Sequence, residues 1–325
     1  MNNLCINCGH AKFVFLYEAP AFDLGPQQED QHFRLGRCQS CQLINTMKVA
    51  PDKVADAYTP DYYGSASSKF IATIERILAL STAVRARKIL RVWLKTNQTE
   101  KSPTVLDIGC GRGHLLRAFK KLGGTALGLE RQEFPVDEKT DDCVRIGSIS
   151  DPEYADRQFD IIILWHVLEH LEKHEALLQD LSNRLSKDGL LIIAVPNFSS
   201  LQQGLFSKYW FHLDLPRHLV HFDKEWLELN LSNNGYEIEF ISSMDPLQNT
   251  FGFIQSSMNF ISRGQRNAFY NLLKHGHFLT GTSIFPSLAW ALLSLILLPF
   301  AILESIISAL YGRGATVQIA ARLKS

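Results

Sequence analysis

The chain has 325 residues, 46% of them hydrophobic, and its 33 lysine and arginine residues balance 33 aspartate and glutamate residues. This length exceeds that of a typical single domain and predicts two or more structural units. Because neither charge is in excess, the composition argues against nucleic acid as a partner. The segment Met1–Cys5 lacks the basic and apolar regions of a signal peptide, so we expect a cytoplasmic protein.

Four of the six cysteines lie before residue 42 in two C-x-x-C pairs, Cys5 with Cys8 and Cys38 with Cys41. Two such pairs offer four thiolates to one tetrahedral zinc ion, which leaves no coordination position for a substrate. The alternatives are two disulfides or two redox motifs. A cytoplasmic protein disfavours disulfides, and thioredoxin-type motifs do not come in pairs. We therefore expect a structural zinc ribbon over residues 1–48.

A glycine-rich turn follows a linker that carries a predicted amphipathic helix over 69–94. The run 104–108 is apolar and of β type, with one acid, Asp107. Three alternating glycines come next, and a helical pattern begins at His114. A strand, a tight turn and a helix N-terminus form the place where an α/β sheet binds a nucleotide-like cofactor. The spacing G-x-G-x-G differs from the dinucleotide fingerprint G-x-G-x-x-G.

The pattern D-x-G-x-G-x-G resembles motif I of the class I S-adenosylmethionine-dependent methyltransferases. Further landmarks of this family follow in order over 101–245: an acid after the run 126–129, a possible adenine cradle at 147–149, and apolar strands at 159–164 and 185–196. The resemblance implies an α/β fold with a Rossmann-like seven-stranded sheet. It also implies that S-adenosylmethionine is held by Asp107, Gly109, Gly111 and Gly113 at the methionine moiety, Glu130 at the ribose, Ser148 and Ile149 at the adenine, and Trp165 and His166 beside the methionine.

A tyrosine-rich stretch at 57–64 precedes the predicted linker helix. Some methyltransferases with an N-terminal zinc ribbon, sugar C-methyltransferases among them, have a similar segment that folds over the active site. Tyr62 and Tyr63 are therefore candidates for a lid. Packing of the ribbon against the core explains the same tyrosines equally well.

The segment His166-x-x-Glu169-His170 matches the H-x-x-E-H signature of a zinc peptidase. It begins directly after a buried strand, in a chain that already has a cofactor loop, so we disfavour a protease. In ubiquinone-pathway O-methyltransferases a similar E-x-x-E-H segment lies beside the methyl donor, where a divalent ion can assist. His166 replaces the first acid here, which leaves metal assistance open. We expect His170, one helical turn beyond His166, to face the acceptor.

A second histidine cluster, 210–222, follows the fifth predicted strand, where this family varies its acceptor-binding insert. His212, His218 and His221 lie close to Pro216. Histidines titrate near neutral pH, as general-base catalysis of hydroxyl methylation requires. Our hypothesis is that His218 deprotonates the acceptor hydroxyl, with His221 as the second choice.

No charged residue occurs from Thr282 to Leu303, a stretch long enough to cross a membrane. The predicted sixth and seventh strands, 236–241 and 315–322, flank it and must pair in one sheet, which a single crossing would prevent. We therefore expect two half-helices that meet near Pro299, either as a re-entrant hairpin or flat in the interface. The alternative is a helical pair that caps the catalytic domain or forms a homodimer core. We favour peripheral membrane contact through 284–311, on the cytoplasmic face.

The expected organisation is a zinc ribbon (1–48), a helical linker or lid (49–100), a methyltransferase core (101–245), a hydrophobic helical insert (246–312) and a last core strand (313–325). The expected function is methyl transfer to a hydroxyl of a membrane-linked acceptor, such as a glycolipid, a polyprenyl-linked sugar or a quinone precursor. Three alternatives stay open: a soluble C- or O-methyltransferase of a nucleotide-linked sugar, a non-catalytic scaffold, and an NAD oxidoreductase.

Overall fold

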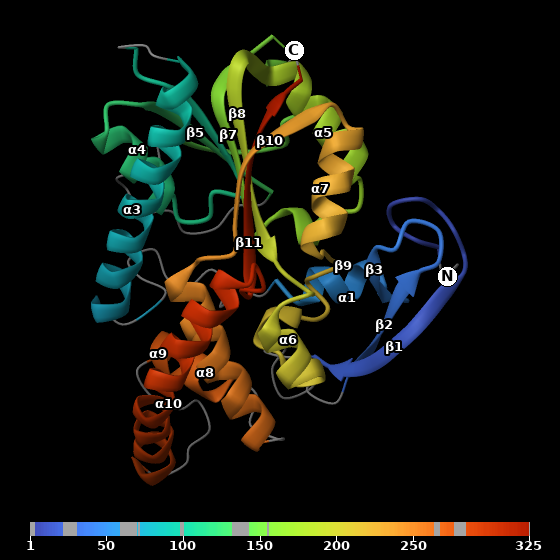
Figure 1. The fold of residues 1–325 in the computed structure, drawn as a ribbon, viewed down its shortest axis with the longest axis vertical. Helices are drawn as coiled ribbons and strands as arrows, with labels where there is room; N and C mark the ends of the chain where they lie inside the picture. The colour runs from blue at the N-terminus through green and yellow to red at the C-terminus, as the bar shows by residue number, and fades with distance from the viewer. Residues whose placement is uncertain are drawn as a thin grey trace.

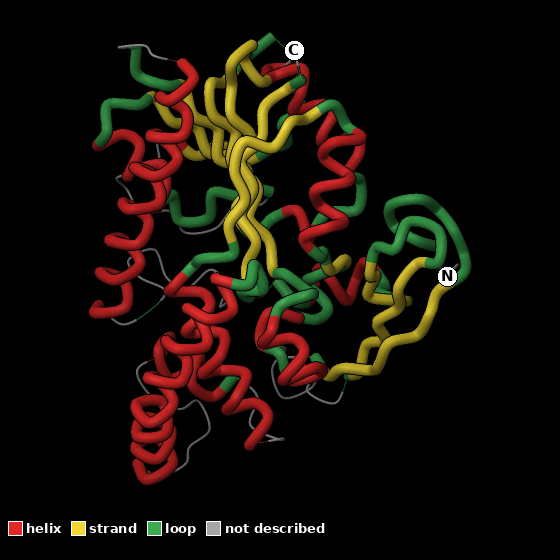
Figure 2. The backbone as a smooth tube through the Cα atoms, in the orientation of Figure 1, coloured by secondary structure: helices red, strands yellow, loops and turns green. Residues whose placement is uncertain are grey.

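The computed structural model of the chain describes residues 4–21, 31–58, 70, 72–97, 101–131, 143–154, 156–262, 267–275 and 284–324. Its strands form two sheets (Figures 1 and 2). Tyr62 and Tyr63, the predicted lid residues, lie outside the described residues.

The larger sheet has seven strands in the order β10-β11-β8-β7-β4-β5-β6. Their bounds are Tyr236–Ser242 (β10), Thr316–Leu323 (β11), Leu185–Pro196 (β8), Phe159–Trp165 (β7), Thr104–Ile108 (β4), Thr125–Glu130 (β5) and Val144–Ile146 (β6). From β8 to β6 neighbouring strands are parallel, whereas β11 runs antiparallel to both β8 and β10. The predicted seven-stranded Rossmann-like sheet is confirmed, including the pairing of its sixth and seventh strands in sequence.

Helices cover both faces of this sheet, which explains why its central strands are continuous apolar runs. On β7, Ile161 and Ile163 pack toward α3 (Ala72–Asn97) and α4 (His114–Lys121). The alternate residues Ile162 and Leu164 pack toward α5 (His174–Arg184) and α7 (Lys224–Asn233), on the opposite face (Figure 1). The predicted linker helix is thus part of the core.

The smaller sheet has the order β1-β2-β3-β9 and lies beside the core (Figure 1). Its first three strands come from the N-terminal segment: Phe13–Pro20 (β1), His32–Cys38 (β2) and Ile44–Met47 (β3). The fourth, β9 (Val220–His221), comes from the second histidine cluster and pairs antiparallel with β3. Leu35 and Ile44 are buried against Trp210 and Leu213, so the N-terminal segment shares a hydrophobic core with the region that follows β8.

Short elements join these layers. They are α1 (Pro51–Asp56), α6 (Leu201–Phe206) and the 3-10 turns η2 (Pro152–Tyr154), η3 (Leu168–His170), η4 (Ser207–Tyr209) and η5 (Phe211–Leu213). Of these, η3 is separated from the end of β7 by two residues and contains Glu169 and His170 of the H-x-x-E-H segment.

The helices between β10 and β11 form a body that extends away from the sheet (Figures 1 and 2). They are α8 (Pro246–Ser262), α9 (Ala268–His275) and α10 (Ile284–Leu310). The expectation of two half-helices meeting near Pro299 is wrong, because α10 is one helix with Pro299 inside it. α8 leads away from the sheet, and α9 turns back along α8, because the N–H of Asn267 donates to Asn259 Oδ1 (2.9 Å) and the N–H of Tyr270 donates to Gln255 Oε1 (2.7 Å). α10 then leads the chain to β11. Pro299 removes one helical hydrogen bond, and α10 packs along α8.

Residues Leu288–Leu310 are long and apolar enough to cross a membrane, with a mean hydropathy of 2.2, although only length and composition support this. The share of this span that is buried inside the protein is 28%. A stripe of Ala301, Glu304, Ser305 and Ser308 faces inward, whereas the residues between them are mostly exposed.

Candidate functional site

A cavity of about 780 Å³ opens at the carboxyl ends of β4, β5 and β7. This is the edge at which open α/β sheets bind their ligands. Seven of the nine predicted cofactor residues line it: Gly109, Gly111, Glu130, Ser148, Ile149, Trp165 and His166. Asp107 lies buried near the end of β4, and Gly113 is the N-cap of α4, with its backbone in the left-handed region (φ +68°).

A Cβ atom would have different consequences at Gly109 and at Gly111, two glycines of the turn. Gly109 has φ +67°, and a Cβ there would lie 2.4 Å from a methyl carbon of Val167. Gly111 has φ +51°, and its missing Cβ would meet no protein atom within 4 Å. Gly111 thus presents bare backbone to the cavity, where a ligand can approach it closely.

Glu130 closes the turn from the end of β5. Its Oε1 accepts a hydrogen bond from the N–H of Gly111 (2.8 Å), and its Oε2 accepts one from the N–H of Arg131 (3.1 Å). Burial raises the pKa of this carboxyl group, while the two backbone hydrogen bonds oppose that effect. Glu130 and the glycine turn, which the sequence analysis predicts from separate motifs, are therefore joined by a hydrogen bond.

Asp107 lies beneath the turn and is 3% exposed. Burial and the nearby charge of Glu130 raise its pKa, Arg85 of α3 opposes both, and the net result is a pKa of about 8. The guanidinium of Arg85 lies over the ring of Trp165, 3.6 Å from its centroid, and its Nη2 lies 3.4 Å from Oδ2 of Asp245. A carboxyl group in this position would be neutral at pH 7 and would ionise when a cation binds next to it.

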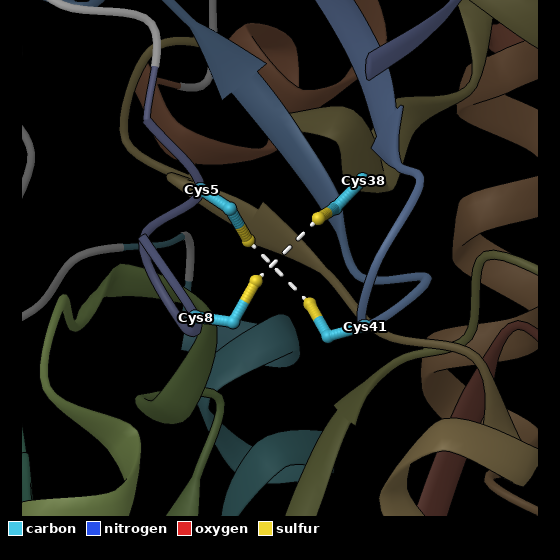
Figure 3. Close-up of side chains that lie close together, drawn as sticks. All are labelled: Cys5, Cys8, Cys38 and Cys41. Carbon is cyan, nitrogen blue, oxygen red and sulfur yellow. Dashed lines mark hydrogen bonds between the residues drawn. The ribbon is translucent and has the colours of Figure 1, made fainter. Parts of the chain in front are cut away.

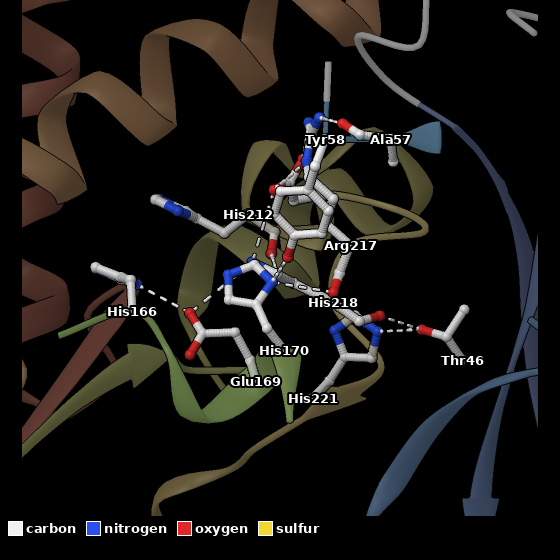
Figure 4. A network of polar contacts seen from close by, with 11 residues as sticks. Thr46, Ala57, Tyr58, His166, Glu169, His170, His212, Arg217, His218 and His221 are labelled. Atoms are coloured by element: carbon white, nitrogen blue, oxygen red, sulfur yellow. Dashed lines mark hydrogen bonds and ion pairs between the residues drawn. The ribbon is translucent and has the colours of Figure 1, made fainter. Parts of the chain in front are cut away.

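A histidine network, here defined as His166, Glu169, His170 and His218, is shown in Figure 4. Two of its members, His166 and His170, line the cavity. Glu169 is 1% exposed, and its Oε1 lies 3.2 Å from Nδ1 of His166 and 3.8 Å from Nε2 of His218. Burial alone would raise the pKa of Glu169, but the hydrogen bond from His166 and the neighbouring histidines lower it to about 2. His166 has φ +55°, which is uncommon for a residue other than glycine and is often found at functional sites.

The three predicted catalytic histidines occupy different positions. His170 lines the cavity, and its Nδ1 donates to the carbonyl oxygen of Arg217 (3.0 Å). His218 lies behind it, with the two rings 4.7 Å apart, and does not line the cavity. His221 lies farther away, where its Nε2 donates to the hydroxyl of Thr46 (3.0 Å) at the smaller sheet. Of these three residues, the structure brings only His170 to the cavity wall.

The histidine network has a donor set that suits a divalent cation. Ligand atoms of Glu169, His170 and His218 all lie within 4.8 Å of one another. His218 Nδ1 donates to the carbonyl oxygen of His212 (3.0 Å), as His170 does to Arg217, and such bonds typically orient metal-binding histidines. Glu169 Oε2 is buried without a hydrogen-bond partner among the described residues.

The four N-terminal cysteines, called the cysteine cluster below, converge on one point (Figure 3). Sγ of Cys5 lies 3.5 Å from Sγ of Cys41, and Sγ of Cys8 lies 3.6 Å from Sγ of Cys38. These distances exceed a disulfide bond of about 2.05 Å. They are close to the roughly 3.8 Å between thiolates that tetrahedral zinc with bonds of about 2.3 Å requires. The geometry is suited to a shared metal ion.

Comparison with known proteins agrees with this geometry. A family model described as a methyltransferase domain matches residues 78–240, about half of the chain. The chain belongs to this methyltransferase family. A ubiquinone biosynthesis O-methyltransferase of Glaesserella parasuis is 32% identical to it over 110 residues, which covers 29% of this chain and 45% of the relative. A mitochondrial ubiquinone biosynthesis O-methyltransferase of Homo sapiens is 29% identical over 163 residues and covers 43% of each chain.

The chain thus spans less than half the length of these two curated relatives. Among solved structures, one from Galdieria sulphuraria described as a sarcosine dimethylglycine methyltransferase has a TM-score of 0.50 at 14% identity, covering 84% of this chain and 98% of that chain. At this identity the likeness shows the methyltransferase fold alone.

Sequence reasoning missed two side chains at the methyltransferase site. Arg85 reads as one of several basic residues on an amphipathic helix, and no motif distinguishes it. Tyr58, whose hydroxyl lies 3.0 Å from Nδ1 of His170, also lines the cavity. Its tyrosine-rich surroundings were a usable signal, although the prediction centred on Tyr62 and Tyr63.

Proposed function

We propose that the protein transfers a methyl group from S-adenosylmethionine to a hydroxyl of a small-molecule acceptor. The observation that carries this proposal is the junction of Gly111 and Glu130, which both line the cavity. There the N–H of Gly111, a residue without a side chain, donates a hydrogen bond to the Glu130 carboxylate and holds it in place. The donor's sulfonium supplies an activated methyl group. The protein's task is therefore to align the acceptor oxygen, the methyl carbon and the sulfur.

Each part of the donor has a proposed partner. Asp107 and the turn of Gly109, Gly111 and Gly113 hold the methionine moiety, and Glu130 holds the ribose. Ser148 and Ile149 contact the adenine edge, and Trp165 and His166 lie along the methionine. Trp165 Nε1 and His166 Nε2 support this assignment, because both atoms are buried without hydrogen-bond partners among the described residues.

The acceptor proton passes, in this proposal, to His166. His166 lines the cavity, and its Nδ1 donates to the buried carboxylate of Glu169, which leaves Nε2 as the basic atom of the ring. His170 lies on the same wall and faces the acceptor. His218, the base favoured by the sequence, lies behind His170, and its role here is to hold Glu169. A divalent cation held by Glu169, His170 and His218 would supply Lewis acidity toward the acceptor hydroxyl.

The proposed acceptor is membrane-linked, and a quinone precursor is the favoured class. The names of the two curated relatives support this class. The surface of α10 supports the membrane link, because the exposed large side chains of its described part are all apolar. The one acid of α10, Glu304, points inward and accepts a hydrogen bond from Gln202 (2.7 Å). We place the protein at the cytoplasmic face of a membrane, with α10 in contact with lipid.

The N-terminal segment is proposed to be a structural zinc ribbon. The four Sγ atoms support this role, and so does Asn45, whose Nδ2 lies 3.6 Å from Sγ of Cys5. We retain the five-part division of the chain that the sequence predicts, with β9 as the one strand that the ribbon sheet takes from the core.

Methyl-labelled S-adenosylmethionine and a whole-cell extract, separated afterwards into lipid and aqueous phases, test this proposal. We expect label in the lipid phase, and less of it with His166→Gln than with His218→Gln. Label only in the aqueous phase would still support methyl transfer, but to a soluble acceptor such as a nucleotide-linked sugar. In that case α10 would be assigned to a dimer interface. Donor binding without transfer to any extract would favour a non-catalytic scaffold.

A further inference from the structure

β3 connects the cysteine cluster with the histidine network through two neighbouring residues. Alternate residues of a strand point to opposite faces, so Asn45 and Thr46 point in different directions. Asn45 is 2% exposed, and its Oδ1 accepts a hydrogen bond from the N–H of Ile6 (2.9 Å), inside the first C-x-x-C turn. Its Nδ2 donates to the carbonyl oxygen of Leu43 (3.0 Å), which follows the second pair and also accepts a hydrogen bond from the N–H of Cys38 (3.0 Å). Asn45 is therefore hydrogen-bonded to the backbone beside both cysteine pairs, so a change in the arrangement of either pair would displace its side chain.

Thr46 is 5% exposed and contacts the second histidine cluster. Its hydroxyl donates to the carbonyl oxygen of His218 (2.7 Å) and accepts from Nε2 of His221 (3.0 Å). Its backbone N–H donates to the carbonyl oxygen of Leu219 (2.9 Å). Three hydrogen bonds from one residue thus fix the segment 218–221.

That segment is bonded in turn to the histidine network. The N–H of Leu219 donates to the carbonyl oxygen of Glu169 (2.9 Å). The side chains of His218 and Glu169 also approach each other, with Nε2 and Oε1 3.8 Å apart. A displacement of Thr46 would therefore reach Glu169 through both backbone and side chain, and Glu169 orients His166 at the cavity wall.

We propose that Thr46 is a positioning residue through which the metal-loaded cysteine cluster sets the geometry of the histidine network. This inference rests on the proposed function. It assigns the N-terminal ribbon a control of the methyl-transfer step through His166, and it leaves the other proposed donor contacts outside this chain of hydrogen bonds. The donor turn supports this separation, because Gly111 and Glu130 lie at the ends of β4 and β5, and neither strand pairs with the smaller sheet.

The first test compares Thr46→Val with Thr46→Ser in the zinc-loaded protein. Valine keeps the shape and removes the hydroxyl, whereas serine keeps the hydroxyl. We expect Thr46→Val to bind S-adenosylmethionine within about twofold of wild type and to transfer label to extract about tenfold to a hundredfold more slowly, with a changed pH profile. Thr46→Ser should restore most of the rate and the wild-type profile.

Thr82→Val is the matched control, because Thr82 is also buried and its hydroxyl donates to the carbonyl oxygen of Leu78 (2.7 Å) within α3. Equal rates and pH profiles for Thr46→Val and wild type would overturn the proposal. So would a Thr46→Ser variant as slow as Thr46→Val, because shape rather than the hydroxyl would then matter.

A second readout does not depend on the acceptor. Removal of zinc by a chelator should shift the imidazole NMR signals of His218 and His170, while S-adenosylmethionine still binds. Unchanged signals on zinc loss would overturn the coupling even if wild type transfers methyl groups. Donor binding by wild type without any transfer would contradict the proposed function, and the NMR result would still decide whether the cysteine cluster and the histidine network are coupled.

Discussion

The guanidinium carbon of Arg85 lies 3.6 Å from the centroid of the Trp165 ring. The two residues come from α3 and from the end of β7, and Trp165 lines the cofactor cavity. Arg85 also pairs with Asp245, the residue that precedes α8. One side chain thus connects the linker helix, the cavity wall and the helical body.

Arg85→Leu should weaken the binding of S-adenosylmethionine by about threefold to thirtyfold, because a partly buried cation–π contact contributes about 0.5–2 kcal/mol. The donor affinity of Arg85→Lys should lie between those of wild type and Arg85→Leu, since lysine keeps the charge but loses planar stacking. Tryptophan fluorescence during donor titration measures this effect. Arg87→Leu, at an exposed position of the same helix, is the control. Equal affinities for Arg85→Leu and Arg87→Leu would contradict this role.

Donor binding should release about one proton near neutral pH. The pKa of Asp107 is raised to about 8 in the empty site, so the group is mostly protonated at pH 7. The donor's positive charges would favour the ionised form and expel the proton. Calorimetry in buffers of different ionisation enthalpy measures the number of protons released, and Asp107→Asn should abolish the release. A buffer-independent binding enthalpy for wild type would contradict a neutral Asp107.

One zinc ion per chain should copurify with the protein, and its removal should lower the free energy of unfolding by several kcal/mol. Cys8→Ser should lose the metal, because Cys8 is one of the four converging thiols. Cys143→Ala, outside the cluster, should retain it. Elemental analysis and chelator-dependent thermal melts check this prediction, and a Cys8→Ser protein that keeps a full zinc content would contradict the site.

Wild-type protein should float with vesicles of phosphatidylcholine and phosphatidylglycerol. The double variant Leu295→Glu and Leu303→Glu should stay in solution, because these side chains are 65% and 55% exposed on α10 and a buried acid is costly in lipid. Leu229→Glu, at a position of α7 that is 62% exposed, serves as the control. Two results would argue against lipid contact through α10: wild type that does not float with the vesicles, or a Leu229→Glu control that loses vesicle binding as completely as the double variant.

Stability should fall as the pH drops below about 6.5. Burial lowers the pKa of His174 to about 4 and those of His212 and His221 to about 3. Between these values and 6.5 the unfolded chain binds protons that the folded chain does not, so folding weakens as pH falls. Each histidine should lower the free energy of unfolding by about 1 kcal/mol per pH unit in this window.

Urea unfolding at pH 7 and at pH 5 measures that slope. His174→Gln should reduce the pH dependence, and His32→Gln, at an exposed position of β2, should leave it unchanged. A stability that is equal at both pH values would show that these rings are not held neutral.

Much of the core sheet was predictable because its signals are local. A β-type run that ends in Asp107 and a glycine turn indicates a parallel strand with its carboxyl end at a ligand, and the same logic places Glu130 and His166 on one edge. The continuous α10 was not predictable in this way. A proline inside an apolar run is compatible with a break or with an unbroken helix, and packing against α8 decides between them.

The site behind the cavity wall depends on contacts between distant parts of the chain. Thr46 and His221 are 175 positions apart, and they meet only because β9 pairs with β3. The density of histidines in 210–222 led to the prediction of a general base there, with His218 first and His221 second. It did not indicate which ring reaches the cavity, because that depends on how η3 packs against the segment before β9.

Calorimetric titration tests whether the junction of Gly111 and Glu130 binds S-adenosylmethionine, and it needs no knowledge of the acceptor. We predict one donor molecule bound per chain, no detectable binding of NAD, and a loss of at least tenfold in affinity for Glu130→Ala in a protein with an unchanged melting temperature. Binding of NAD in place of S-adenosylmethionine, or a Glu130→Ala variant with wild-type affinity, would contradict the claim.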